Sequence, residues 1–220
     1  FPVVMVAWLA GVPVAIHDQV AGLGLANRLS QPFSRKVLVA RREGLDFVPA
    51  KKGVLVGNPV MGAILKVGPK TKMGAPPTIY ITGGSSGAQR LNRMIEAILP
   101  ELVVNFRVIH QTGELDFAYF RGKASRNYRV YDFIPPEKLP AIFREADIII
   151  SRAGANTVSE ILVTGRPSIL IPIPWTIFDE QNKNAHAAKA SGIAEVVSEA
   201  EATPEKLLRT LEAIVTNWQE

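Results

Sequence analysis

Residues 151–160, with the sequence S-R-A-G-A-N-T-V-S-E, combine a small-residue turn with a carboxylate at a spacing suited to a nucleotide. The apolar run before them, residues 146–150, predicts a buried strand, and the apolar spacing after them favours a helix that ends at Gly165. Such a turn directs backbone N–H groups at whatever lies above the strand end, which suits a phosphate or a polar sugar. In this arrangement Glu160 can accept two hydrogen bonds from a ribose diol. A capping box, with Thr157 as N-cap and Glu160 as its partner, explains the same residues without a ligand.

A second stretch, residues 79–89, also runs from a predicted strand through a glycine loop into a predicted helix. Its sequence, I-Y-I-T-G-G-S-S-G-A-Q, lets the backbone approach a diphosphate closely, and Ser85 adds a hydroxyl donor. The loop is not a Walker A motif, because no Gly-Lys-Ser/Thr follows, and it is not G-x-G-x-x-G. Taken alone, it is equally consistent with a plain tight turn.

A third stretch, residues 172–185, passes from a strand end through a loop into a helix rich in amide side chains. Amides both donate and accept hydrogen bonds, which suits sugar hydroxyls. The alternative interpretation is an N-cap at Asp179 followed by solvated Gln181 and Asn182.

The elements that must position these stretches alternate regularly along residues 78–220. An alternation of strands and helices predicts an α/β fold, in which helices cover both faces of a parallel sheet. We predict strands at residues 78–82, 106–110, 128–131, 147–150, 168–171 and 194–197. We predict helices at residues 88–99, 115–121, 136–145, 157–164, 180–191 and 204–218.

The first part of the chain shows a shorter version of this alternation. His17 and Asp18 follow a predicted strand, at the end where ligands gather in open α/β sheets. Residues 66–77 hold three Lys, two Gly and three Pro with little apolar pattern, and we predict a linker there, between residues 1–65 and 78–220. Helices are predicted at residues 3–10 and 21–29, and strands at 12–16 and 36–40, before an apolar segment at 53–56.

Composition narrows the possible functions. The 220 residues are 47% hydrophobic and 20% charged, as expected of a globular protein with a sizeable core. The chain has no cysteine, which excludes disulfides and Cys-ligated zinc, and no Asp-x-Asp pair that would suggest a divalent metal on a diphosphate. Its three histidines, His17, His110 and His186, are too scattered to indicate a metal site, and His110 at a strand end is interpreted as structural. No basic patch with interleaved aromatics predicts nucleic-acid binding.

Charge and hydropathy set the opening segment apart. Residues 1–56 carry seven Lys or Arg and three Asp or Glu, so most of the net charge of +5 lies there. A basic segment of this kind favours an anionic membrane surface, although an ordinary solvated face explains it equally well. Residues 1–16 are uncharged but too short to span a bilayer, and they lack the basic start of a signal peptide. Because the chain opens on Phe1, we expect it to begin within a domain, as a fragment or a processed chain.

Taken together and in this order, the three stretches resemble the MurG family, the peptidoglycan N-acetylglucosaminyltransferases of glycosyltransferase family 28, which have the GT-B fold. The resemblance covers nearly the whole chain, and the combination of motifs is specific. The matching motifs are G-G-S-x-G-A at residues 83–88, S-R-A-G-A-x-T-V-x-E at 151–160, D-x-Q-x-K-N-A at 179–185, G-N-P-V at 57–60, G-x-P-V at 11–14 and G-L-A-N-R at 24–28, with the family's H-E-Q matched by His17-Asp18-Gln19.

The resemblance implies a Rossmann-like, donor-binding domain of the GT-B type at residues 78–220, preceded at residues 1–65 by the last part of a second Rossmann-like domain that faces acceptor and membrane. It implies inverting transfer of GlcNAc from UDP-GlcNAc to the C4 hydroxyl of MurNAc on lipid I, giving lipid II, without a metal or other cofactor. It also implies a peripheral protein on the cytoplasmic face of the bacterial plasma membrane. The family's site residues correspond to Ser85 for the phosphates, the backbone of Ile134 for uracil, Ala155, Asn156, Thr157, Val158 and Ser159 for the nucleotide and diphosphate, Glu160 for the ribose and Gln181 for GlcNAc.

The resemblance leaves the catalytic base unassigned, because the family's N-terminal glycine loop, with the histidine often favoured as base, has no counterpart here. His17 and Asp18 are candidates for assisting acceptor binding, and we expect the 220-residue chain alone to be inactive. Three departures from the family pattern bear on donor affinity or sugar identity: Val20 for an Asn, Met61 for an Arg, and Glu180 for a His or Gln. Two alternatives therefore stay open, another GT-B transferase with a different sugar and a non-catalytic donor-binding subunit that needs a partner half.

Overall fold

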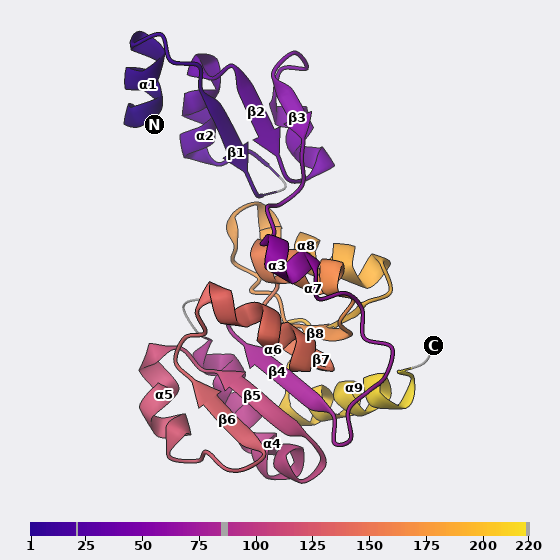
Figure 1. Ribbon diagram of the computed structural model, residues 1–220. Helices are drawn as coiled ribbons and strands as arrows, with labels where there is room; N and C mark the ends of the chain where they lie inside the picture. The colour runs from indigo at the N-terminus through magenta and orange to yellow at the C-terminus, as the bar shows by residue number, and fades with distance from the viewer. Residues whose placement is uncertain (21, 85–87, 219–220) are drawn as a thin grey trace. The chain divides into compact units, whose positions relative to one another are not determined.

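The computed structural model describes residues 1–20, 22–84 and 88–218, and the chain divides into two compact units (Figure 1). Phe1–Pro59 and Thr176–Glu180 form the first unit, and Val60–Trp175 and Gln181–Glu220 form the second. Each unit has a parallel sheet and a hydrophobic core of its own. In the part of the chain that the structure describes, no helix is both long and apolar enough to cross a lipid bilayer.

The first unit is built on a three-stranded parallel sheet in the order β1–β2–β3. Side chains alternate between the faces of a strand, and alternate residues of β2, Val37 and Val39, are fully buried in the core of this unit. The elements are α1 (Pro2–Leu9), β1 (Ala15–Asp18), α2 (Leu25–Ser30), β2 (Lys36–Val39) and β3 (Gly53–Leu55).

Two predicted elements of this unit are shifted in the structure. Strand β1 begins at Ala15 rather than at residue 12, after Pro13, whose ring holds φ at about −65° instead of the roughly −120° of a parallel strand. His17 and Asp18 are therefore the last residues of the strand and not part of the loop after it. Helix α2 begins at Leu25 rather than at residue 21, because the N–H of Gly24, its N-cap, donates to the Asp18 carboxylate at 2.7 Å instead of entering a helix.

The second unit is built on a six-stranded sheet in the order β6–β5–β4–β7–β8–β9, in which all neighbours are parallel. Each strand lies within one residue of its predicted range, which confirms the α/β class. The strands are β4 (Thr78–Thr82), β5 (Arg107–Gln111), β6 (Tyr128–Tyr131), β7 (Ile148–Ser151), β8 (Ser168–Leu170) and β9 (Ala194–Val196).

The strand order reverses between β4 and β7. After β4 the chain adds β5 and β6 on one side, and it then returns to pair β7 with β4 on the other side. The loops that follow β4 and β7 therefore leave the same edge of the sheet side by side and lead to helices on opposite faces. In open parallel sheets this reversal point is where ligands bind.

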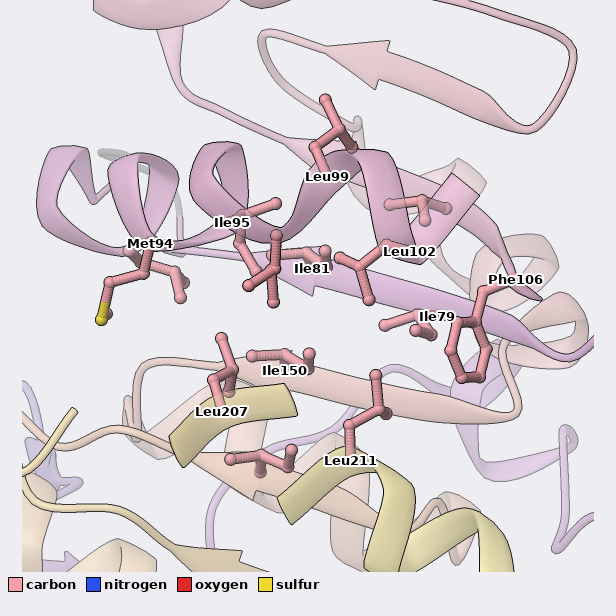
Figure 2. Close-up of a cluster of buried hydrophobic side chains, with 14 of the residues drawn as sticks. Ile79, Ile81, Met94, Ile95, Leu99, Leu102, Phe106, Ile150, Leu207 and Leu211 are labelled. Carbon is pink, nitrogen blue, oxygen red and sulfur yellow. The ribbon is translucent and has the colours of Figure 1, made fainter. Parts of the chain in front are cut away.

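The two faces of this sheet carry two hydrophobic cores. Consecutive residues of β4 divide between them, since Ile81 belongs to the first core and Tyr80 to the second. Figure 2 shows the first core, in which side chains of α4 and α9 pack with the isoleucines of β4 and β7. The helices contribute Ile95 and Leu99 from α4 and Leu207 and Leu211 from α9, and the strands contribute Ile79 and Ile150. The helices of the chain that follow the first unit's sheet are α3 (Gly62–Leu65), α4 (Gln89–Asn105), α5 (Glu114–Arg121), α6 (Leu139–Glu145), α7 (Ala155–Thr164), α8 (Glu180–Ala190) and α9 (Pro204–Thr216).

Helix α4 is longer than predicted. The predicted helix ended at residue 99, but the helix continues through Pro100 to Asn105. A proline inside a helix removes one hydrogen bond and costs about 3 kcal/mol. The continuation buries Leu102 completely and brings Phe106 into the same core. Burial of each such side chain stabilises the folded state by about 1.5–3 kcal/mol, which offsets the cost of the proline.

Residues 66–77, the predicted linker, belong to the second unit and are bonded to the amino end of its sheet. The buried carboxylate of Asp147, just before β7, accepts hydrogen bonds from the N–H groups of Thr78 at 2.7 Å and Gly74 at 3.0 Å. The Lys70 ammonium lies 2.7 Å from the same carboxylate. The guanidinium of Arg166 also donates to the carbonyl of Gly68 at 3.0 Å.

Candidate functional site

The first loop at the reversal point follows β4 and leads into α4. Gly84 adopts the left-handed conformation, with φ +83°, that glycine tolerates best, and its N–H donates to the Thr82 hydroxyl at 3.0 Å. Residue 88, the N-cap of α4, is an alanine and offers no side-chain acceptor to the first helical turn. Among the described residues no side chain caps this helix start, and helix N-termini favour anions. Ser85, the predicted phosphate contact, lies outside the residues that the structure describes.

The second loop follows β7 and leads into α7. The helix begins at Ala155, with Gly154 as N-cap, so Thr157 is the third helical residue and not the N-cap. The capping-box interpretation of Thr157 and Glu160 is therefore wrong. It failed because Gly154, whose ψ of 148° is extended, takes the N-cap position three residues earlier. The first turn, residues 155–157, points its backbone N–H groups out of the helix end, toward the space above the sheet.

The groups of the next turn of α7 bond and pack within the protein. The N–H of Val158 bonds to the carbonyl of Gly154 at 3.0 Å, and its side chain is buried in the second core. The Ser159 hydroxyl donates to the carbonyl of Ala155 at 2.7 Å. Of the five residues predicted to line the diphosphate, Ala155, Asn156 and Thr157 are thus the ones at the helix end.

Glu160 lies one turn further along α7 and is half-buried. Within the described residues its carboxylate forms no ion pair and accepts no hydrogen bond. Burial raises the pKa of Glu160 to about 7. Burial also raises the pKa of the Tyr80 phenol to about 12, and the negative charge of Glu160 adds to that effect. A desolvated carboxylate that lacks a partner and lies at a strand-end site is a candidate for ligand binding.

Gln111 connects the other predicted parts of the site, and sequence reasoning missed it. Its amide nitrogen donates to the carbonyl of Gly84 at 3.0 Å. Its amide oxygen accepts from the N–H of Ile134 and from the Tyr80 phenol, both at 3.3 Å. The signal that was available is its position as the last residue of a strand, β5, next to the reversal point. Ile134, predicted to hold uracil through its backbone, is thus tied to the first loop.

Helix α8 is joined to the second loop by an amide. The buried Asn184 donates to the carbonyl of Ala153 at 2.9 Å, between β7 and α7. The side-chain oxygen of Gln181, the predicted sugar contact, accepts from the N–H of Ile173, just after β8, at 3.1 Å. The amide-rich helix therefore borders the loops that follow β7 and β8.

His110 and the acceptor-side candidates, His17 and Asp18, have defined partners. His110 is fully buried between the Tyr128 hydroxyl at 2.8 Å and the Asn92 side-chain oxygen at 3.0 Å, and burial lowers its pKa to about 3, which confirms the structural interpretation. In the first unit, the Nε2 atom of His17 lies 3.1 Å from the carbonyl oxygen of Gly57. The Asp18 carboxylate accepts three hydrogen bonds, from the N–H groups of Val20 and Gly24 and the amide of Asn27, and is buried. Across residues 1–20, 22–84 and 88–218, no three His, Asp or Glu side chains gather closely enough to hold a metal ion.

The family of the chain follows from the second unit. Residues 78–220 match the sequence model of the glycosyltransferase family 28 C-terminal domain. The chain belongs to glycosyltransferase family 28. Both predictions from the motifs, the family and the GT-B type of fold, are thereby confirmed by the match and by the structural likeness that follows.

Relatives within glycosyltransferase family 28 extend the likeness to the first unit. One relative is the UDP-N-acetylglucosamine–N-acetylmuramyl-(pentapeptide) pyrophosphoryl-undecaprenol N-acetylglucosamine transferase of Desulfotalea psychrophila. The two sequences are 35% identical over an alignment of 227 residues, which covers the whole of this chain and 61% of the relative. The chain is 36% identical over 217 residues to the transferase of the same name from Myxococcus xanthus, covering 96% of this chain and 56% of the relative. Among solved structures, Acinetobacter baumannii MurG superposes with a TM-score of 0.72 at 30% identity, covering 99% of this chain and 62% of that one. The chain therefore spans about three fifths of the length of the relatives it matches.

Proposed function

We propose that the second unit binds UDP-GlcNAc and that the protein transfers its GlcNAc, with inversion and without a metal, to the C4 hydroxyl of MurNAc on lipid I. The observation that carries the proposal is that two helix starts, neither capped by a side chain of the described residues, follow the neighbouring strands β4 and β7 at the reversal point, with the half-buried carboxylate of Glu160 one turn further along α7. Helix N-termini bind phosphates, and a carboxylate that has no cationic partner suits a ribose diol. The names of the relatives support the same donor and acceptor.

Each part of UDP-GlcNAc has a counterpart in this proposal. The diphosphate lies between the N-termini of α4 and α7 and bonds to the backbone of residues 155–157, with Val158 and Ser159 behind them. Ser85 is proposed as a further phosphate contact. The ribose hydroxyls bond to Glu160, and uracil bonds to the backbone of Ile134. Because the Ile134 N–H donates to Gln111 at 3.3 Å, uracil would replace the Gln111 oxygen at that amide. GlcNAc lies toward α8 and bonds to Gln181.

The chemistry in this proposal is a displacement at C1 of GlcNAc. The acceptor hydroxyl forms a bond to C1 on one face while the bond from C1 to the UDP oxygen breaks on the other, which inverts C1. The charge that develops on UDP is stabilised by the two helix starts, and this positioning supplies most of the rate enhancement. The acceptor hydroxyl loses its proton to a base. We leave that base unassigned: His17 and Asp18 are proposed to assist acceptor binding only, and Asp18 is already engaged by three donors.

The first unit is proposed to face the acceptor and the cytoplasmic side of the plasma membrane. Its charge supports this, because residues 1–56 carry seven basic and three acidic side chains. Its surface supports it too, since Val3, Val6 and Leu9 of α1 are 80%, 66% and 72% exposed. Anionic lipids attract basic side chains, and exposed apolar side chains can enter the interface. The donor-binding domain of the proposal is residues 78–220, and residues 66–77, the predicted linker, belong to the second unit with it.

Calorimetric titration of UDP into the 220-residue chain, with and without EDTA, tests the donor site. We expect the same dissociation constant in both conditions, because the helix starts rather than a metal ion hold the diphosphate. Binding that disappears on chelation would contradict the metal-free site. The same chain titrated with UDP-GlcNAc, UDP-GalNAc and UDP-glucose tests whether Val20, Met61 and Glu180 change the preferred sugar; tighter binding of one of the other two would favour the alternative GT-B transferase.

A further inference from the structure

A buried carboxylate, Glu199, holds two guanidinium groups at the carboxyl edge of the six-stranded sheet. Arg152 donates to it through both terminal nitrogens, Nη1 to Oε2 and Nη2 to Oε1, the latter at 3.1 Å. Arg90 donates to the Glu199 carbonyl at 2.6 Å, and its Nε lies 3.4 Å from Oε1. The side chains of Arg152 and Glu199 are only 7% and 5% exposed, whereas Arg90 is 53% exposed.

This cluster, Arg90–Glu199–Arg152, joins the ends of four strands. Arg152 is the first residue after β7, and its backbone N–H lies 3.4 Å from the carbonyl oxygen of Thr82, the last residue of β4. Its Nη1 also donates to the carbonyl of Ile171, just after β8, at 3.1 Å. Glu199 itself comes after β9, and Arg90 lies in the first turn of α4. The cluster therefore fixes the start of α4 and the loop before α7 to one another.

Fold stability alone gives little reason for such a cluster. Replacing a buried ion pair by apolar side chains of similar volume is often neutral or stabilising, because the charges lose their hydration. What the pair does supply is a fixed geometry between the loop after β7 and the segment after β9. The Nε atom of Arg152 is buried and has no hydrogen-bond partner among the described residues.

We propose that Glu199 and Arg152 are positioning residues for the donor diphosphate. By holding the loop after β7 against the start of α4, they keep the two helix ends at the separation at which each can bind one phosphate. The inference rests on the proposed function and deepens it. Neither residue contacts the uridine in this arrangement, so their loss should weaken binding of UDP and leave binding of uridine unchanged.

The test compares dissociation constants for UDP and uridine, measured by calorimetry on the 220-residue chain. Glu199→Gln removes the charge that joins the cluster. The double variant Arg152→Met/Glu199→Leu replaces the buried pair by apolar side chains of similar size, which such sites tolerate. Asp147→Asn is the matched control, because Asp147 is an equally buried, ion-paired carboxylate at the opposite, amino end of the same sheet. Melting temperatures are recorded for all variants.

We expect the ratio of the two dissociation constants, uridine over UDP, to fall about tenfold in both cluster variants, because a displaced helix end would lose about one hydrogen bond to a phosphate. The ratio should be unchanged in Asp147→Asn even if its melting temperature falls. A double variant that melts like the wild type and keeps the wild-type ratio would overturn the proposal, because the cluster would then serve only the fold. A wild-type chain that binds neither ligand would overturn the proposed function and this inference with it, so the two failures are distinguishable.

Discussion

Replacement of Glu160 by glutamine tests both the buried carboxylate and the proposed ribose contact. Burial raises the pKa of Glu160 from 4.5 to about 7. Between these two values the folded protein keeps a proton that the unfolded chain has released, so the free energy of unfolding falls as the pH rises from about 4.5 to about 7 and is level above that. Glutamine has the same shape and no charge. It should therefore remove this pH dependence.

The magnitude follows from the pKa shift. One pKa unit corresponds to about 1.36 kcal/mol, and solvent screening at a half-buried site reduces the total to about 1–2 kcal/mol. Glu160→Gln should accordingly be more stable than the wild type by about 1–2 kcal/mol at pH 8, a gain of about 2–8 °C in melting temperature. Near pH 4.5 the two proteins should melt together, because the wild-type carboxyl is then protonated.

Nucleoside binding should change in the opposite sense. Only the ionised carboxylate can accept both ribose hydrogen bonds, and with a pKa of about 7 it is roughly one-tenth ionised at pH 6 and nine-tenths ionised at pH 8. The dissociation constant of uridine should therefore fall up to about ninefold between pH 6 and pH 8. The glutamine variant should bind at least tenfold more weakly than the wild type at pH 8, since charge-assisted bonds are worth about 1.5–3 kcal/mol each, and its affinity should not vary with pH.

The assay is calorimetric titration at pH 6, 7 and 8, paired with thermal melts from pH 4.5 to pH 8. Uridine rather than UDP is the ligand, because phosphate groups titrate near pH 6 and would obscure the carboxylate. Glu212→Gln, on the exposed side of α9, controls for the loss of one negative charge. An affinity for uridine that is the same in the wild type and in Glu160→Gln, and flat with pH in both, would remove Glu160 from the proposed site.

Three further predictions concern the rest of the chain. We expect the 220-residue chain to transfer no radiolabelled GlcNAc to a lipid I analogue, because it spans about three fifths of its relatives' length; turnover above that of Glu160→Ala would show the prediction to be wrong. Liposome co-sedimentation should increase with anionic lipid and decrease with salt, because each basic side chain near an anionic surface contributes about 1 kcal/mol, and equal binding to neutral vesicles would refute the charge argument. His110→Ala should lower the free energy of unfolding by about 2–5 kcal/mol in urea, because it leaves buried Tyr128 and Asn92 atoms without their partner. Because burial lowers the pKa of His110 from 6.5 to about 3, the unfolded wild type binds a proton at pH 5 that the folded protein does not, so the loss should be smaller at pH 5 than at pH 8; a loss that grows toward pH 5 would contradict the assignment.

The strands and most helices of the second unit could be predicted because their residues alternate or recur with the period of the element. The predicted boundaries were wrong where contacts with other elements determine where a helix begins or ends. Leu102 and Phe106 carry α4 past Pro100, and the Asp18 carboxylate delays the start of α2. Neither contact is visible in local periodicity, because the partners come from other elements.

The candidate site shows the same division. The two loops and Glu160 have a local pattern, strand then small residues then helix, and the reversal point brings the loops together as the motifs required. Gln111 and Glu199 have no such pattern. Gln111 gains its contacts only because β5 pairs with β4, and Glu199 meets Arg152 only across β8. The start of α7 was misplaced because Thr157 is a good N-cap residue, while Gly154 is selected by the geometry of the turn.

The strand order also divides the donor site between two consecutive modules of the chain. The first runs from β4 to β6 and the second from β7 to α9, and the α6 segment between β6 and β7 connects them. Under the proposed function, the first module recognises the base and one phosphate, and the second recognises the ribose, the other phosphate and the sugar. Recombination between family members within α6 would then transplant sugar preference while leaving the nucleobase unchanged. A chimera joined there should take its donor sugar from the parent of its second module, whereas joining within α4 or α7 would split one recognition function between two parents.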